Sequence, residues 1–189
     1  MNITPINNSN RLFQLTNILP TVLSDAVLGL EWPKMHWERG NRQEKWNRRH
    51  IQSDQHSILQ QVSEYIWQHL GIIEQACNVA FIGIYPSTVW WYNEPGFDVS
   101  LHTDGHLPAT MQIFWVAPGK QFATQFYNSK NNNDSTTNLE FIANTGYLML
   151  NMLNSDGSQP LQWHGMLNKV PADTFRVSSY TTFGPYENK

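Results

Sequence analysis

The sequence predicts a mainly β domain of the sandwich, jelly-roll or barrel type, preceded by a short helical segment. The composition is that of a folded chain, because 40% of its 189 residues are hydrophobic, 13% are aromatic and only 14% are charged. Helical periodicity is confined to the part of the chain before Gly71. Beyond it, short β-type runs follow one another without intervening helical patterns, which argues against a parallel sheet with crossover helices.

The N-terminal part begins with a predicted strand over 12–15 and a helix over 20–30, in which Pro20 suits the first helical turn. A second helix is expected to begin near Ser53 or Asp54, either of which is a suitable N-cap, and to end at Gly71. Its apolar residues repeat on one face: Ile58, Leu59, Val62, Tyr65, Ile66 and Leu70.

The remaining runs are typical of strands, being short and rich in β-branched and aromatic residues. They cover residues 79–85, 88–92, 99–103, 110–116, 121–127, 139–143, 147–153, 161–167 and 174–183. The polar stretch 128–138 has too little apolar content to pack, so we expect a long connection between strands there.

The length fits one domain over 1–189, with a helical part at about 16–71 and a β core at about 79–185. The single cysteine, Cys77, favours a reducing, cytoplasmic setting. A net charge of −3 offers no global attraction for nucleic acid or an anionic membrane, and no run approaches 18 apolar residues. We therefore expect neither a nucleic-acid partner nor a membrane segment.

Three residues have the chemistry of a metal site: His102, Asp104 and His164. On a strand, side chains two residues apart face the same way, so His102 and Asp104 can converge on one ion. His164 lies in a later strand-like run and is the natural third ligand. Two imidazoles and one carboxylate suit non-heme Fe(II), although zinc could use the same ligands.

Arg176 and Ser178 share the polar face of the last predicted strand, together with Tyr180. If the stretch 168–173 is the turn of a hairpin, Arg176 falls opposite His164 and reaches toward the metal. A guanidinium beside a hydroxyl is suited to hold the far carboxylate of a dicarboxylate cosubstrate.

At these positions the chain resembles the Fe(II)/2-oxoglutarate-dependent dioxygenase superfamily, whose H-x-D, distal H and R-x-S pattern is reproduced from His102 to Ser178. The run from Tyr92 to Gly96 is similar to the approach to H-x-D in the prolyl hydroxylase-like branch, with one extra residue. The resemblance implies a cosubstrate-contacting tyrosine at Tyr92, with Tyr85 as a second candidate. It also implies a double-stranded β-helix (a jelly-roll or cupin-like barrel) with the N-terminal helices packed on its outside.

The resemblance further implies Fe(II) as cofactor, 2-oxoglutarate and molecular oxygen as cosubstrates, and hydroxylation of a substrate coupled to oxidative decarboxylation of 2-oxoglutarate. The carboxylate of Asp104 favours hydroxylation over halogenation, because related halogenases have a small residue there. The prime substrate is open among protein side chains, amino acids and small metabolites, because loops set specificity in such folds.

Two other features allow more than one interpretation. His106 is an alternative ligand or a residue of the pocket rim. The segment 32–49 contains half of the 12 Lys and Arg residues, interleaved with three tryptophans. We interpret it as a solvated segment whose tryptophans pack onto the barrel, with a substrate-binding lid as the alternative. Nucleic-acid demethylases of the superfamily carry a second arginine that residues 177–184 lack, which disfavours base repair.

Two alternatives to an oxygenase stay open on the residues alone. The first is a cupin-like protein that uses a divalent metal for other chemistry, since the ligand set does not name the ion. The second is a non-catalytic β-barrel binding module.

Overall fold

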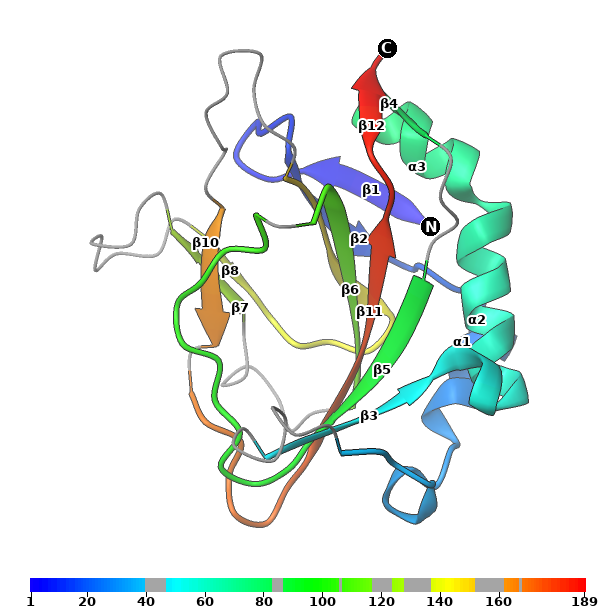
Figure 1. Cartoon of the computed structure of the whole chain (residues 1–189), viewed down its shortest axis with the longest axis vertical. Helices are drawn as coiled ribbons and strands as arrows, with labels where there is room; N and C mark the ends of the chain where they lie inside the picture. Colours follow the sequence, from blue (N-terminus) through cyan, green and yellow to red (C-terminus); the bar gives the residue numbers. More distant parts are fainter. Residues whose placement is uncertain are drawn as a thin grey trace.

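The computed structural model describes residues 1–39, 47–82, 87–105, 107–116, 124–127, 137–151, 162–166 and 168–189. Within these ranges the protein is mainly β, with a large antiparallel sheet, two smaller sheets and three α-helices (Figure 1). The mainly β class predicted from the sequence is therefore confirmed. Among the described residues, no helix combines the length and the hydrophobicity needed to cross a membrane.

The large sheet has seven strands in the order β1-β2-β9-β6-β11-β5-β3, and every neighbouring pair is antiparallel. In that order the strands are Asn2–Pro5, Leu12–Thr16, Thr145–Leu150, Ala109–Val116, Arg176–Phe183, Ser87–Asn93 and Arg48–Gln52. Strands distant in the sequence thus lie side by side, such as β2 and β9, and the last long strand, β11, sits between β6 and β5.

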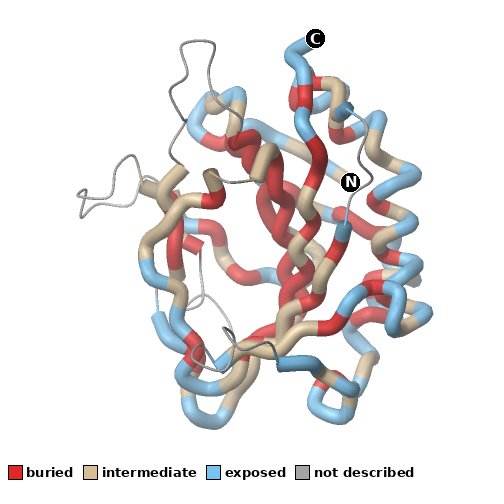
Figure 2. The backbone as a smooth tube through the Cα atoms, viewed as in Figure 1, coloured by how far each residue is buried: buried red, intermediate tan, exposed pale blue. Residues whose placement is uncertain are grey.

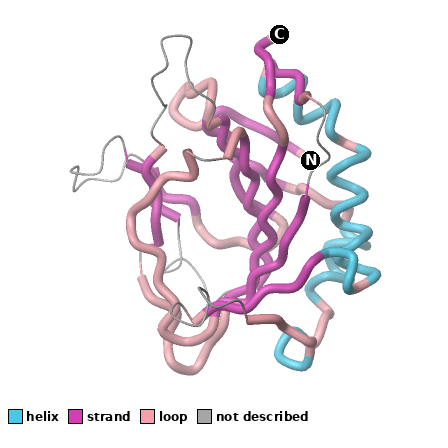
Figure 3. The backbone as a smooth tube through the Cα atoms, viewed as in Figure 1, coloured by secondary structure: helices cyan, strands magenta, loops and turns pink. Residues whose placement is uncertain are grey.

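The α-helices cover one face of the large sheet (Figures 1 and 3). They are α1 (Thr21–Leu28), α2 (Ser57–Gln68) and α3 (Leu70–Cys77), accompanied by the short 3-10 helices η1 (Trp32–Lys34) and η3 (Ser53–Gln55). The buried face of α2, formed by Leu59, Val62 and Ile66, belongs to the same apolar cluster as Met111 and Ile113 of β6. Every third or fourth residue of the helix and every second residue of the strand meet in this core.

The opposite face of the large sheet looks toward a three-stranded sheet, in the order β10-β7-β8, on the far side of the molecule (Figure 1). These strands are Trp163–Met166, Thr124–Tyr127 and Thr137–Leu139. A second buried cluster joins the two sheets and includes Phe114 and Tyr147 from the large sheet and Phe126 from the small one. Figure 2 shows that the large sheet is buried along most of its length, since both of its faces are covered. A third, two-stranded sheet pairs β12 (Tyr186–Asn188) with β4 (Val79–Phe81).

The second helix differs from its predicted course at both ends. Residues Ser53–Gln55 form a separate 3-10 turn, and α2 begins after His56, whose Nδ1 accepts a hydrogen bond from the backbone N–H of Ile58 at 3.2 Å. The predicted end at Gly71 is wrong, because this glycine lies inside α3. The helical segment ends instead at Asn78, which adopts the left-handed conformation (φ 55°) that terminates helices.

Several strand predictions also need correction. Residues 99–103 are not a strand. They contact β10 through an isolated bridge between His102 and His164 and through a hydrogen bond from the N–H of Met166 to the carbonyl of Val99. Residues 140–143 are loop, because β8 occupies Thr137–Leu139. The short polar strands β1 and β3 were not expected. Of the predicted connection 128–138, residues 128–136 lie outside the described residues and the last two belong to β8.

The segment 32–49 is described only at 32–39 and 47–49, so Arg42, Lys45 and Trp46 lie outside the described residues. Trp32 is buried in the core and stacks on Trp90 of β5 with ring centroids 5.6 Å apart. Trp37 lies against Trp32, at 6.1 Å. These contacts agree with the interpretation that the tryptophans pack onto the β core.

Candidate metal centre and cosubstrate pocket

A cavity of about 410 Å³ lies between the large sheet and the three-stranded sheet. Its walls include Trp91 and Arg176 from the large sheet, Thr124 and His164 from the small sheet, and Asp104 from the segment that connects β5 to β6. Side chains from five regions of the sequence therefore face one space, as is typical of ligand pockets.

His102, Asp104 and His164 come together at this cavity, as predicted. One ligand atom from each residue can be chosen so that all lie within 4.8 Å of one another. Nε2 of His102 is 3.7 Å from Oδ1 of Asp104, and Nε2 of His164 is 3.8 Å from Oδ2 of the same carboxylate. The two imidazole rings have centroids 4.3 Å apart. The carboxylate thus lies within reach of both imidazoles, and one ion can be bound by all three side chains.

Backbone carbonyls orient the two histidines in the same way. Nδ1 of His102 lies 2.9 Å from the carbonyl oxygen of Ser100, and Nδ1 of His164 lies 3.0 Å from that of Gln162. A carbonyl oxygen can only accept, so Nδ1 carries the hydrogen in each ring and Nε2 keeps its lone pair. Such hydrogen bonds to the second nitrogen are the usual support of metal-binding histidines.

The surroundings of the triad keep it in the form that binds a metal. Asp104 and His164 are 8% and 4% exposed. Burial lowers the pKa of His164, although the charge of Asp104 opposes this effect, so the imidazole is neutral at pH 7. The hydroxyl of Tyr180 donates to Oδ2 of Asp104 at 2.7 Å. Burial and the negative charge of Asp104 raise the pKa of Tyr180, which therefore stays protonated and able to donate.

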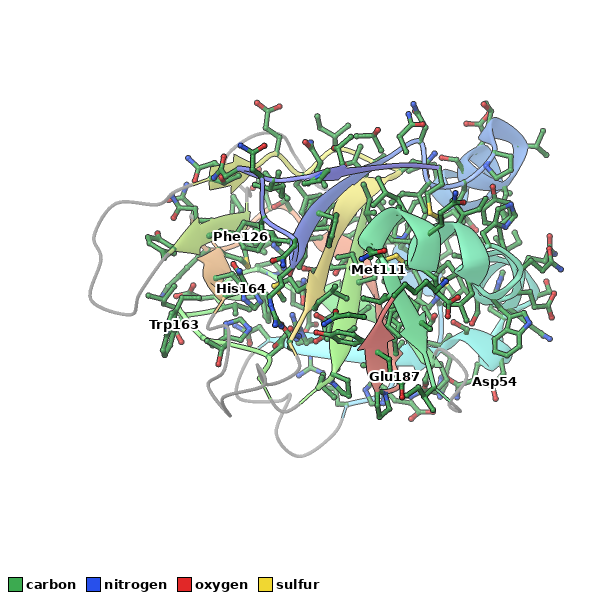
Figure 4. The ribbon with its side chains drawn as sticks, turned by 90° about the horizontal axis from the view of Figure 1, so that it is seen from above. Asp54, Met111, Phe126, Trp163, His164 and Glu187 are labelled. Carbon is green, nitrogen blue, oxygen red and sulfur yellow. The ribbon has the colours of Figure 1, made fainter. Side chains whose placement is uncertain are left out.

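A close approach of the backbone makes the histidine pair possible. The segment around His102 lies against β10, and the backbone N–H of each histidine donates to the carbonyl of the other at 2.9 Å. Next to His164, Gly165 has no side chain, and a Cβ there would lie 3.1 Å from the carbonyl oxygen of Val99. Figure 4 shows His164 and Phe126 between the two sheets, with Trp163 farther out.

Arg176 lines the same cavity, but the predicted hairpin with His164 is wrong. Strand β10 pairs with β7, whereas β11 pairs with β5 and β6, so the two residues lie in different sheets. The chain between them crosses from the small sheet to the large one. It is held there by Val170, whose N–H donates to Phe97 and whose carbonyl accepts from Gly96. Arg176 and His164 thus meet across the pocket.

Arg176 is 3% exposed, and Nε and Nη1 of its guanidinium have no hydrogen-bond partner among the described residues. Its carbon lies 5.0 Å from the ring centroid of Phe141 and 5.5 Å from that of Phe97. Burial lowers the pKa of Arg176 to about 10, so the group is still charged at pH 7. A buried charged donor without an acceptor is costly, and an anion in the cavity would supply one.

The structure does not bring the other two predicted cosubstrate residues into the cavity wall. Ser178 is buried and its hydroxyl accepts from Nε2 of Gln112 at 3.1 Å. Tyr92 lies on the helix-covered face of the sheet, where its ring stacks on Phe175 at 4.9 Å and lies 5.2 Å from Trp37. Tyr85 and His106 lie outside the described residues.

Three pocket residues were not recognised from the sequence as functional candidates. Gln112 bridges two strands by donating to Ser178 and accepting from the hydroxyl of Tyr147 at 2.6 Å. Arg48 of β3 brings a second guanidinium to the wall. The alternation of β11 placed Tyr180 on the same face as Arg176, but nothing in the sequence linked it to Asp104.

The fold is that of the Fe(II)/2-oxoglutarate oxygenases. It is similar to a Pseudomonas putida prolyl-4-hydroxylase, with 13% identity over 92% of each chain and a TM-score of 0.63. It is also similar to a collagen prolyl hydroxylase of Paramecium Bursaria Chlorella virus-1 in a 2-oxoglutarate complex, with 12% identity, a TM-score of 0.64 and coverage of 97% of this chain and 100% of that one.

A third similar structure, HygX from Streptomyces hygroscopicus with nickel and 2-oxoglutarate bound, has 8% identity and a TM-score of 0.59 over 92% of this chain and 82% of that one. No protein-family model matches the sequence, and no curated protein matches it.

Proposed function

We propose that this protein is an Fe(II)/2-oxoglutarate-dependent oxygenase that hydroxylates a substrate while 2-oxoglutarate is oxidatively decarboxylated. The observation that carries the proposal is the presence, in one cavity, of the His102–Asp104–His164 triad and a buried arginine with unpartnered donors, Arg176. The shared fold supports it. We interpret the two facing sheets as the two halves of a double-stranded β-helix.

In this proposal the triad holds Fe(II), and Arg176 binds the distal carboxylate of 2-oxoglutarate. The ligand set fits, because two neutral imidazoles and one carboxylate leave the remaining positions of a six-coordinate ion free for cosubstrates. When bound, iron supplies the redox chemistry by which oxygen is activated and a C–H bond is hydroxylated. The chain's own residues orient the ligands, bind the dicarboxylate and limit access of water to the cavity.

The presence of Arg176 favours a 2-oxoglutarate-dependent enzyme over a cupin-like protein that uses a divalent metal for other chemistry. Nε and Nη1 of Arg176 need an acceptor that no described residue supplies, and a carboxylate is the usual partner of a buried guanidinium. The apolar rings of Phe97 and Phe141 lie close to the guanidinium carbon, at 5.5 Å and 5.0 Å. They limit competing water, which strengthens the attraction between the guanidinium and a bound carboxylate. Ser178 supports this wall indirectly, by fixing Gln112.

The direct test is anaerobic binding of Fe(II) and 2-oxoglutarate, followed by measurement of succinate released when air is admitted. We expect roughly equimolar iron, and succinate formation that depends on both Fe(II) and 2-oxoglutarate. The variant His102→Ala should lose metal binding and succinate formation. The control His36→Ala removes an exposed histidine that is distant from the triad in the sequence, and it should retain both.

The variant Arg176→Met separates an oxygenase from a metal protein of another kind. An oxygenase should keep its metal affinity and need at least about tenfold more 2-oxoglutarate, because a charge-assisted pair contributes about 1.5–3 kcal/mol. A protein that binds metal but gives no response to 2-oxoglutarate would be a cupin-like metal protein. A wild-type protein that binds no metal at all would be a non-catalytic binding module.

A further inference from the structure

Three polar side chains form a row across the large sheet, and the outer two, Arg48 and Arg176, line the cavity. Asn93 of β5 is the direct antiparallel partner of Arg48 in β3 on one side and of Arg176 in β11 on the other. Direct partners on neighbouring strands project from the same face of a sheet, so the three side chains are neighbours. The row places two guanidinium groups on either side of one amide.

The row is rich in hydrogen-bond donors and poor in acceptors. Nε of Arg48 donates to Oδ1 of Asn93 at 2.8 Å, which fixes the orientation of the amide. Within the described part of the chain, the amide nitrogen of Asn93 is then left without a partner, although this residue is 0% exposed. Nε and Nη1 of Arg176 are in the same state. Buried donors are nearly always paired in folded proteins, so this row carries more donors than its own acceptors satisfy.

The charges in the row point to the same conclusion. The guanidinium carbons of Arg48 and Arg176 lie 4.3 Å and 5.5 Å from the ring centroid of Phe97, so both positive charges are in the same part of the cavity. The ring of Trp91 lies 4.5 Å from Arg48. Burial, and then the charge of Arg176, lower the pKa of Arg48 to about 9, and it remains charged at pH 7.

The described part of the cavity wall contains one carboxylate to balance these two charges, that of Asp104. In the proposed function this carboxylate is a ligand of the metal. The neighbouring Glu94 does not help, because it pairs with Arg39 and Arg49. A single 2-oxoglutarate has one distal carboxylate, and Arg176 takes it. The charge of Arg48 is then left without a counter-charge in the described cavity wall.

We propose that Arg48, oriented by Asn93, forms a second anion subsite, which binds a carboxylate of the prime substrate beside the 2-oxoglutarate held by Arg176. The inference rests on the proposed oxygenase function and narrows its substrate to a carboxylate-bearing molecule. Arg48 supplies the charge and the planar donors that suit a carboxylate, and Asn93 holds the guanidinium in place by accepting from its Nε. The flanking aromatic rings favour an apolar body attached to that carboxylate.

The test uses matched probes that differ only in charge: butanoate and butanamide, benzoate and benzamide. Their binding is measured by calorimetry, without oxygen, on protein loaded with Fe(II) and saturating 2-oxoglutarate, so that Arg176 is occupied. We expect at least one carboxylate to bind at least tenfold more tightly than its amide. The variant Arg48→Met, which keeps the length of the side chain and removes its charge, should abolish this preference.

Companion variants check that the effect belongs to the subsite. Arg48→Lys should retain part of the preference, because it keeps the positive charge. Arg49→Met removes the adjacent arginine, which pairs with Glu94, and should leave the preference intact. In each variant the dissociation constant of 2-oxoglutarate should change by less than about threefold.

Two results overturn the inference. Carboxylates and amides that bind equally, or do not bind, to protein that binds 2-oxoglutarate normally would show that no second anion subsite exists. A tenfold loss of 2-oxoglutarate affinity in Arg48→Met would assign Arg48 to the cosubstrate itself. Failure of the oxygenase proposal looks different, because the wild-type protein would then not bind 2-oxoglutarate. The carboxylate preference, with its loss in Arg48→Met, would still decide whether the subsite exists.

Discussion

The hydroxyl of Tyr180 donates a hydrogen bond of 2.7 Å to Oδ2 of Asp104, and so connects β11 of the large sheet to the predicted carboxylate ligand. Asp104 belongs to no strand, and the segment that carries it touches the small sheet through the bridge between His102 and His164. The tyrosine therefore positions a ligand whose own backbone is not part of a sheet.

Replacement of Tyr180 by Phe should weaken metal binding by about tenfold to a hundredfold, the usual effect of removing a hydrogen-bond partner of a metal ligand. The loss should be seen in Fe(II) or Mn(II) titrations, with little change in thermal stability of the metal-free protein. Tyr127→Phe is the matched control, because that hydroxyl donates to Gln125 at 2.8 Å and lies outside the cavity wall. Equal metal affinities of the two variants would show that Tyr180 does not position Asp104.

Gly146 is the position in the large sheet where a side chain is least tolerable. It pairs with Ile113 in β6, and an added Cβ would lie 1.9 Å from the carbonyl oxygen of Gln112. Gly146→Ala must push β9 away from β6, and we expect a loss of about 3 kcal/mol or more of unfolding free energy. Chemical denaturation measures the loss.

Gly71→Ala is the control for Gly146→Ala, since it adds the same methyl group where nothing lies within 4 Å. Within helix α3 this change should be neutral or stabilise by up to about 1 kcal/mol, because alanine favours a helix over glycine. Similar denaturation midpoints for the two variants would mean that β9 can move away from β6 at little cost in unfolding free energy.

The metal triad could be predicted from the sequence because its signal is local and ordered: an H-x-D step, a late histidine and an arginine twelve residues after it. The arrangement around it could not. The prediction that 164 and 176 face each other in a hairpin assumed that consecutive β runs pair, whereas the chain between them crosses to another sheet, held at Gly96 and Phe97.

Arg48 was missed for a related reason. It lies in a basic, tryptophan-rich segment whose composition is typical of a solvated surface. Only the pairing of β3 with β5, in which Arg48 lies opposite Asn93, brings its side chain to the cavity wall. Its neighbour Arg49 faces the other way and pairs with Glu94. Two adjacent arginines thus have opposite environments. Alternation along a strand requires this difference, but the sequence does not show which of the two arginines faces the cavity.

The thiol of Cys77 should be unreactive in the folded protein. It is buried at the end of α3, and burial raises its pKa to about 12 from the usual 9.0. Because the thiolate is the nucleophile, its fraction at pH 8 is roughly a thousandfold below that of a free thiol. Alkylation by iodoacetamide should be correspondingly slow, and should still rise between pH 9 and 10, where a free thiol reaches its plateau.

Since Cys77 is the single cysteine, the number of alkylated thiols reports on it alone. The same protein in urea should react at the rate of N-acetylcysteine, which provides the control. A native rate within tenfold of that value, or a plateau below pH 9, would contradict the burial of this side chain.

Glu94 should make the stability of the protein depend on pH in the acidic range. Burial of its carboxyl tends to raise the pKa, but the hydrogen bonds and charges of Arg49 and Arg39 outweigh burial and hold the pKa below its usual 4.5. A carboxyl with a lowered folded-state pKa stabilises the protein above its unfolded pKa, and this contribution is lost as the pH falls through the folded value. Both arginines are partly exposed, so we expect about 1 kcal/mol or less.

The measurement compares urea unfolding of the wild-type protein and Glu94→Gln at pH 7 and at pH 4. The wild type should be the more stable at pH 7, and the difference should shrink at pH 4. The matched variant Glu64→Gln is the control for the loss of a carboxylate, because among the described residues its side chain accepts from the neutral amide of Gln60 in the same helix. If the Glu94 difference were constant across this range, the ion pairs would not contribute to stability through the charge of Glu94.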